Sequence, residues 1–78
     1  MGTLEQLIKE YEEFFYLSKK GELYRFILEI IERLVIEGVL ARTYGNKLKA
    51  ARILGINRNT LHAKIKKLGI EVRKWKRI

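Results

Sequence analysis

A chain of 78 residues has room for one small domain, and with no Cys and a single His it lacks disulfides and structural zinc ligands to stabilise it. The same composition excludes the usual catalytic triads and metal clusters, so no enzyme activity, cofactor or metal is expected. The net charge of +8 divides into −3 over residues 1–38 (five Lys or Arg, eight Glu) and +11 over residues 39–78 (twelve Lys or Arg, one Glu), which predicts a polyanionic partner for the second half.

The first expected element is a helix that ends near residues 17–20, before Gly21. Thr3 suits its N-cap, and Gln6 three residues later completes a capping box. Helical spacing places its apolar residues on one face. That face comprises Leu4, Leu7, Ile8, Tyr11, Phe14 and Phe15.

A second helix is expected from about Glu22 to Thr43. Its charged residues form one narrow stripe, so roughly 200° of its surface is apolar, more than a surface helix normally presents. Gly38 is expected to permit close packing. The pattern predicts a homodimer through the first two helices, residues 1–43, although a helix merely central in a monomer remains the alternative. The predicted dimerisation residues are Leu7, Tyr11, Phe14, Phe15, Phe26, Ile27, Ile30, Ile31 and Leu34.

Two short helices follow, at residues 47–54 and 58–68, and together with their caps they span residues 46–69. Each follows an Asn that suits an N-cap and ends at a Gly that suits a left-handed C-cap. Two short helices joined by a glycine turn are typical of a helix-turn-helix. The expected inward residues are Leu48, Ala51, Leu54, Leu61, Ile65 and Leu68, with small Ala50 and Ala51 allowing close crossing and Ile53 and Ile56 joining the apolar seam.

The second of these helices carries the candidate chemistry. A recognition helix reaches base edges from its N-terminal residues, where Arg58 suits guanine and Asn59 suits adenine. Hydroxyl and Lys side chains farther along suit phosphates, as does the start of the preceding helix. The predicted DNA-binding residues are Asn46, Lys47, Lys49, Asn57, Arg58, Asn59, Thr60, His62, Lys64, Lys66 and Lys67.

Residues 71–78 form a basic tail. It is interpreted either as a solvated end or as an auxiliary phosphate contact. Trp75 is expected to pack back on the helices, with contact to DNA or no contact at all as the alternatives. The acidic, helix-patterned start is unlike a secretory signal, and no stretch approaches about 18 uncharged apolar residues. A cytoplasmic protein without membrane contact is therefore expected, and the resemblance described next implies a bacterial one that acts at the nucleoid.

The run from Gly45 to Ile70, GNKLKAARILGINRNTLHAKIKKLGI, closely resembles the helix-turn-helix of the Fis family. The same module ends the NtrC-type activators that work with the sigma-54 polymerase. The resemblance implies an all-α, four-helix protomer that dimerises through its first two helices. His62 and Ala63 stand where Fis itself has basic residues. The residues that match DNA-contacting positions of the family are Asn46, Asn57, Arg58, Thr60, Lys64, Lys66 and Lys67.

The sequence thus predicts a single domain over residues 1–78 that binds double-stranded DNA at a pseudo-palindromic site. The leading hypothesis is the DNA-binding domain of a sigma-54-dependent activator, whose contact with the polymerase would involve domains outside this sequence. A free-standing, DNA-bending nucleoid protein of the Fis type is the close alternative. A helical dimer that binds an acidic protein is the alternative from another class, and RNA binding is disfavoured because a protruding helix cannot read the narrow major groove of A-form RNA.

Overall fold

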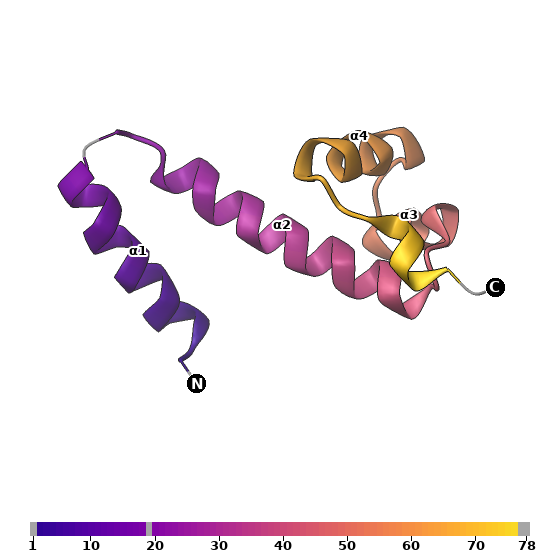
Figure 1. Ribbon diagram of the computed structural model, residues 1–78, viewed down its shortest axis with the longest axis horizontal. Coiled ribbons are helices and arrows are strands. Elements are labelled where there is room, and N and C mark those ends of the chain that lie inside the picture. Colours follow the sequence, from indigo (N-terminus) through magenta and orange to yellow (C-terminus); the bar gives the residue numbers. More distant parts are fainter. Residues whose placement is uncertain (1, 19, 77–78) are drawn as a thin grey trace. The chain divides into compact units, whose positions relative to one another are not determined.

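The computed structural model describes residues 2–18 and 20–76, and over these residues the protein is all-α, as predicted. Its elements are α1 (Leu4–Ser18), α2 (Leu23–Arg42), α3 (Lys47–Leu54), α4 (Arg58–Leu68) and a short 3₁₀ helix, η1 (Val72–Trp75) (Figure 1). The chain divides within α2 into two compact units, Met1–Ile30 and Ile31–Ile78. Within the described part, no helix combines the length and apolar character needed to cross a membrane.

The first unit consists of α1 and the start of α2. The predicted capping box is confirmed: the Thr3 N–H donates to Gln6 Oε1 at 3.0 Å, and the Gln6 N–H donates to Thr3 Oγ1 at 3.1 Å. The two helices meet through aromatic rings, since Phe26 lies 4.9 Å from Tyr11 and 5.0 Å from Phe15 between ring centroids. No residue of α1 is fully buried, so this unit has contacts between its helices but no closed core.

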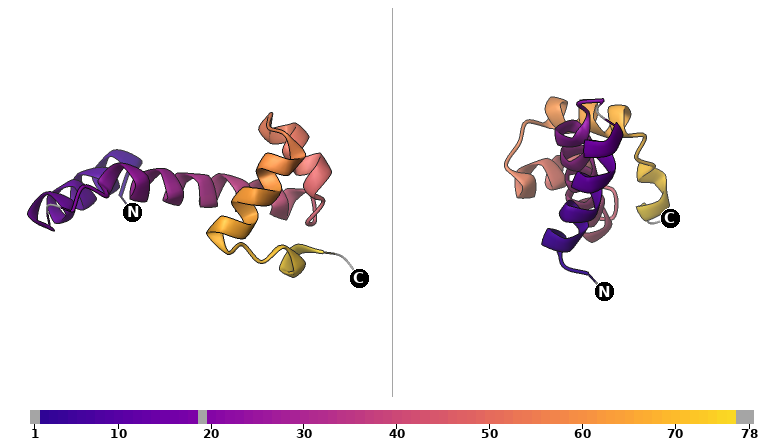
Figure 2. Two further views of the ribbon diagram at one scale, coloured as in Figure 1. Left: turned by 90° about the horizontal axis from the view of Figure 1, so that it is seen from above. Right: turned by 90° about the vertical axis from the view of Figure 1, so that its left-hand side faces the viewer.

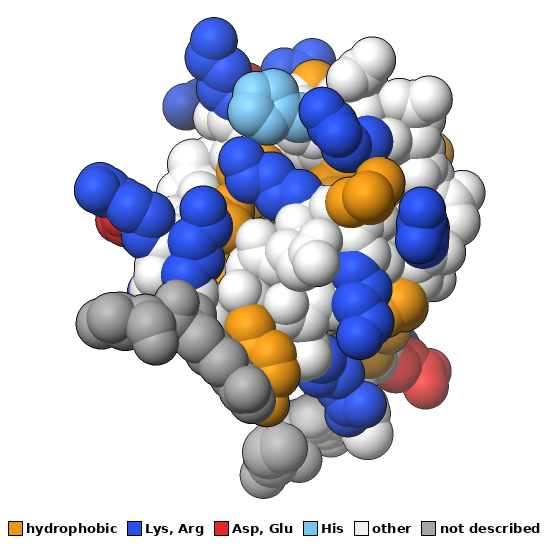
Figure 3. Space-filling view, turned by 90° about the vertical axis from the view of Figure 1, so that its right-hand side faces the viewer, with side chains coloured by type: hydrophobic (Ala, Val, Ile, Leu, Met, Phe, Trp, Pro, Cys, Tyr) orange, Lys and Arg blue, Asp and Glu red, His pale blue; other side chains and the backbone are white. Residues whose placement is uncertain are grey.

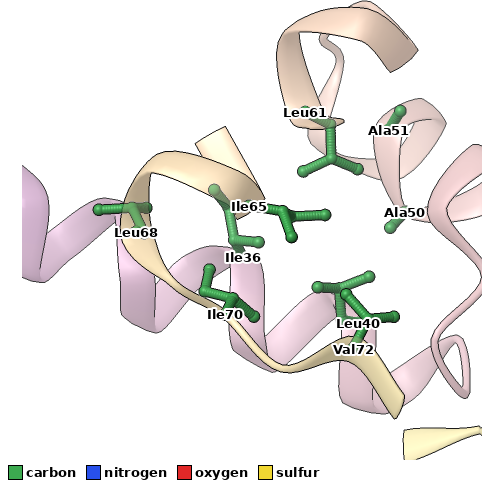
Figure 4. Close-up of a cluster of buried hydrophobic side chains, with 9 residues drawn as sticks. All are labelled: Ile36, Leu40, Ala50, Ala51, Leu61, Ile65, Leu68, Ile70 and Val72. Carbon is green, nitrogen blue, oxygen red and sulfur yellow. The ribbon is translucent and has the colours of Figure 1, made fainter. Parts of the chain in front are cut away.

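The second unit contains the hydrophobic core, which lies where the end of α2 meets α3 and α4 (Figure 4). Leu40 of α2 and Leu61 of α4 are completely buried. Ala50 and Ala51 are also buried, which confirms that small residues let α3 and α4 approach closely. The other members of the core are Ile36, Ile65, Leu68, Ile70 and Val72.

Two expectations about packing were wrong. Leu48 and Ile53 are 45% and 59% exposed, because α3 packs through Ala50, Ala51 and Leu54 and these two side chains lie at opposite margins of that face. A Cβ added to Gly38 would meet no atom of the described residues within 4 Å, so the close packing expected at Gly38 stays a prediction about a partner copy. The inward face expected for α4, in contrast, is confirmed at Leu61, Ile65 and Leu68.

The chain after α4 turns back toward the end of α2 (Figure 2). Ile70 and Val72 enter the core, and Trp75 packs against it, which confirms the expectation for Trp75. The burial of Ile70 and Val72 was not predicted, since Val72 lies within the predicted basic tail and Ile70 directly precedes it. Residues 70–75 are therefore part of the folded second unit.

Candidate nucleic-acid interface

The start of α4 is fixed by local hydrogen bonding. Asn57 has an extended backbone (φ −68°, ψ 144°), and its Oδ1 accepts the Asn59 N–H at 2.7 Å, as expected of an N-cap. Gly55, which ends α3, is left-handed at φ 73° and makes the sharp turn between the helices. The Asn57 cap and the left-handed Gly55 thus set the direction in which the first turn of α4 projects.

The two faces of α4 differ sharply. One face is buried in the core through Leu61, Ile65 and Leu68. The opposite face is open to solvent and polar or positively charged, so it can contact a large anionic partner without unfolding the domain. The exposed predicted residues on this helix and its cap are Asn57, Arg58, Asn59, Thr60, His62, Lys66 and Lys67.

The start of α3 contributes to the same surface. Asn46 caps α3 by accepting the Lys49 N–H at 3.1 Å, and Asn46 and Lys49 are exposed while Lys47 is half-buried. A hollow of about 330 Å³ is lined by Lys47 and Leu48 from α3 and by Arg58, Asn59 and His62 from α4. The helix-turn-helix therefore brings the first turns of both helices to one basic, partly apolar surface.

Lys64 differs from the other predicted contacts, because it is half-buried and its Nζ forms an ion pair with Glu32 of α2. At the C-terminal end of α4, the carbonyl of Leu68 accepts a hydrogen bond from the Arg33 guanidinium of α2. This carbonyl is one of those that the last turn of a helix leaves without an internal partner. These contacts fasten α4 to α2. Sequence analysis missed them, because residues 32 and 35 positions apart carry no local spacing signal.

A further group of cations lies beside these residues. A second hollow, of about 630 Å³, shares Lys47 and His62 with the first and extends past Lys66 to Arg73 and Lys76. Figure 3 shows Lys and Arg side chains gathered over one face, with few acidic side chains among them. The basic surface is therefore larger than the helix-turn-helix alone.

Comparison with known proteins identifies the family of this chain. A profile described as "Bacterial regulatory protein, Fis family" matches residues 27–68. The "DNA-binding protein Fis" of Glaesserella parasuis is 37% identical over 68 residues, which cover 87% of this chain and 69% of that protein. The "DNA-binding transcriptional regulator NtrC" of Azospirillum brasilense is 41% identical over 75 residues, which cover 91% of this chain and 15% of that protein.

The relatives thus differ widely in length, and the chain spans only a small part of the regulators named NtrC. A second NtrC, from Bradyrhizobium, is 50% identical over 50 residues, or 10% of its length. No solved structure gives a significant match. The profile match over more than half of the chain, together with the similarity to Fis over most of both proteins, shows that this chain belongs to the Fis family of bacterial regulatory proteins.

Proposed function

We propose that this protein binds double-stranded DNA sequence-specifically as a homodimer, with α4 of each copy in the major groove. The observation that carries the proposal is the division of α4 into a buried apolar face and an open basic face, anchored by the Asn57 cap. An α-helix fits the major groove of B-DNA, and a recognition helix presents its N-terminal residues to the base edges.

The chemistry of the first turn of α4 suits base recognition. The guanidinium of Arg58 can donate two hydrogen bonds to guanine O6 and N7, and the Asn59 amide can bond adenine N6 and N7. Both side chains are exposed and line the same hollow, so neither has to leave the core to reach a base. These two residues are proposed to specify sequence.

The surrounding residues suit the sugar–phosphate backbone, which fixes register without reading sequence. Asn46, Lys47 and Lys49 are proposed to contact the phosphates of one strand, and Lys66, which lines the second hollow with Lys47, is proposed to extend these contacts along α4. A phosphate contact by Lys64 would have to compete with Glu32 for its ammonium group. Thr60, His62 and Lys67 complete the proposed contact set.

The dimer is proposed from the apolar surface that α1 and α2 leave open. Phe14 is 65% exposed, Leu34 is 62% exposed and Leu7 is 36% exposed, and exposed apolar surface of this kind marks interaction sites. The remaining proposed dimerisation residues are half-buried: Tyr11, Phe15, Phe26, Ile27, Ile30 and Ile31. Residues 1–43 would hold two copies together, and residues 46–69 would present the two recognition helices.

The biological setting is proposed from the relatives. Similarity over 75 residues to a regulator named NtrC favours the DNA-binding domain of a sigma-54-dependent activator, acting at the nucleoid in the cytoplasm and meeting the polymerase through other domains. Similarity over 69% of a protein named Fis favours the alternative, a free-standing DNA-bending protein. A native reading frame that encodes an ATPase module before this segment would decide for the activator.

Selection from randomised duplexes, followed by anisotropy titration at several salt concentrations, tests the proposal. We expect enrichment of two inverted half-sites about one helical turn apart and a steep negative slope of log K against log salt. Enrichment of no sequence, with tighter binding to an acidic polypeptide than to any duplex, would instead support the protein-interaction alternative.

A further inference from the structure

The segment after α4 is anchored at three points in the second unit. Ile70 and Val72 are 7% and 9% exposed, and the Trp75 ring packs against the same core. The Lys74 Nζ lies 4.6 Å from the centroid of that ring, a cation–π contact within the segment itself. Figures 2 and 4 show this return of the chain toward α2. The backbone that carries the charged residues of the segment is therefore held against the core.

Contact between residues 72–76 and the turn that joins α2 to α3 gives independent evidence that this segment packs on the second unit. A Cβ added to Gly45 would come within 3.0 Å of Lys76 Cγ and 3.3 Å of the Val72 carbonyl oxygen. Gly45 is also left-handed, at φ 80°, so it serves both the turn and the close approach of the chain end. Lys76 thereby lies directly beside the residues that begin α3.

Residues 70–76 extend the basic surface from α4 toward Arg73 and Lys76. The charged lining of the 630 Å³ hollow comprises Lys47, Lys66, Glu71, Arg73 and Lys76, with His62 beside them. Because Lys47 and His62 also line the hollow with Arg58 and Asn59, the surface continues without a break from the first turn of α4 to the end of the segment.

Among the described residues that line this hollow, only Glu71 carries a carboxylate, and its Oε1 lies 3.6 Å from Arg73 Nη2. The side chains of Arg73 and Glu71 are 87% and 64% exposed, and ion pairs so open to water hold their partners weakly. The guanidinium of Arg73 can therefore exchange this carboxylate for another anion.

From these observations we propose that η1 and Lys76 form a second phosphate-binding element, in which Arg73 and Lys76 contact the DNA backbone beside the groove that α4 enters. The partner chemistry is the regularly spaced phosphate of the same duplex, because the surface is continuous with the proposed base-reading residues. This inference rests on the proposed DNA binding, and it extends the contacted DNA beyond the helix-turn-helix. Phosphate contacts add affinity without adding sequence preference.

The test compares Arg73→Gln/Lys76→Gln with a control, Lys20→Gln/Arg25→Gln, which removes the same two charges from exposed positions in the first unit. Gln keeps the aliphatic stem that packs beside Gly45. We expect the segment variant to bind selected and scrambled duplexes about tenfold or more weakly at low salt, with a salt slope flatter by about two units per protomer. The ratio of the two affinities should not change. A slope and affinity equal to those of the control would overturn the inference.

The Glu71→Gln variant should change DNA affinity in the opposite sense, toward tighter binding. Removing this carboxylate frees Arg73 and relieves repulsion from phosphate, so we expect severalfold tighter binding to both duplexes, and unchanged or weaker binding would contradict the inference. Equal thermal unfolding midpoints would establish that all variants fold. Failure of the wild-type chain to bind any duplex would defeat the proposed function itself, whereas wild-type binding with an inert segment would overturn this inference alone.

Discussion

Asn57 combines a structural task with a position on the proposed DNA-binding surface. Its Oδ1 accepts the Asn59 N–H at 2.7 Å, and its side chain is exposed next to Arg58. The cap satisfies one of the N–H groups that the first turn of a helix leaves without a partner. Stability and DNA binding should therefore respond differently to substitutions at this one residue.

We expect Asn57→Ala to lower the free energy of unfolding by about 1 kcal/mol, because the cap is lost. Asn57→Asp should keep the stability, since a carboxylate also caps and is favoured at a helix N-terminus, yet it should weaken DNA binding by repelling phosphates. Urea unfolding and anisotropy titration of both variants measure the two effects. If Asp lost as much stability as Ala, the assigned cap would be wrong.

The residues that could be identified from sequence are those whose role depends on near neighbours. Asn46 and Asn57 are recognisable as caps, because an Asn oxygen reaches an N–H only two or three residues later. The pair of Glu32 with Lys64 is not recognisable, since it depends on how α2 and α4 cross. Lys64 was grouped with the phosphate contacts for that reason.

At the scale of elements, α4 is held by a small set of buried leucines and isoleucines. Leu61 is completely buried between α2 and α3, whereas Leu48 of α3 is 45% exposed. We expect Leu61→Ala to lower the free energy of unfolding by about 2–5 kcal/mol, because it leaves a cavity in a closely packed core. The matched change Leu48→Ala should cost about 0.5 kcal/mol or less.

Chemical denaturation of both variants measures this difference. Similar losses at Leu61 and Leu48 would mean that α3 packs through a different face from the one described. A loss confined to Leu61 would locate the support of the recognition helix in the core that α4 shares with α2 and α3.

The helices themselves were predictable, because their periodicity and their Gly and Asn boundaries are local features. The face that α3 buries was not fully predictable: within eight residues, Leu48, Ala51 and Ile53 all suit an inward position, and only the neighbouring helices decide. The packing of residues 70–75 on the core was not predicted, because Ile70 and Val72 alternate with charged residues and show no helical period. Burial there comes from tertiary contact.

For the whole molecule, the proposed dimer can be tested at the exposed apolar residues of α2. We expect Leu34→Glu to weaken self-association strongly, because the 62% exposed side chain would be covered by a second copy and a buried carboxylate without a partner is costly. Ile53→Glu is the matched control, since Ile53 is 59% exposed and lies outside the proposed interface. Sedimentation equilibrium measures the association of both variants.

The wild-type unfolding midpoint should also rise with protein concentration, as it does for a protein stabilised by dimerisation. A wild-type chain that sediments as a monomer, or a Leu34→Glu variant that associates as tightly as Ile53→Glu, would rule out the proposed dimer. The apolar excess of α2 predicts such an assembly in outline, and the dimer stays a prediction, because which exposed residues meet depends on the partner copy.

The central claim is that the first turn of α4 reads DNA sequence while the rest of the basic surface holds phosphates. The most direct test measures the affinities of Arg58→Ala and Lys66→Ala for the selected site and for a scrambled duplex. We expect Arg58→Ala to lose roughly 1–3 kcal/mol on the selected site with little loss on the scrambled one. Lys66→Ala should weaken both duplexes alike and flatten the salt slope by about one unit per protomer. Equal losses on both duplexes from both substitutions would contradict the account.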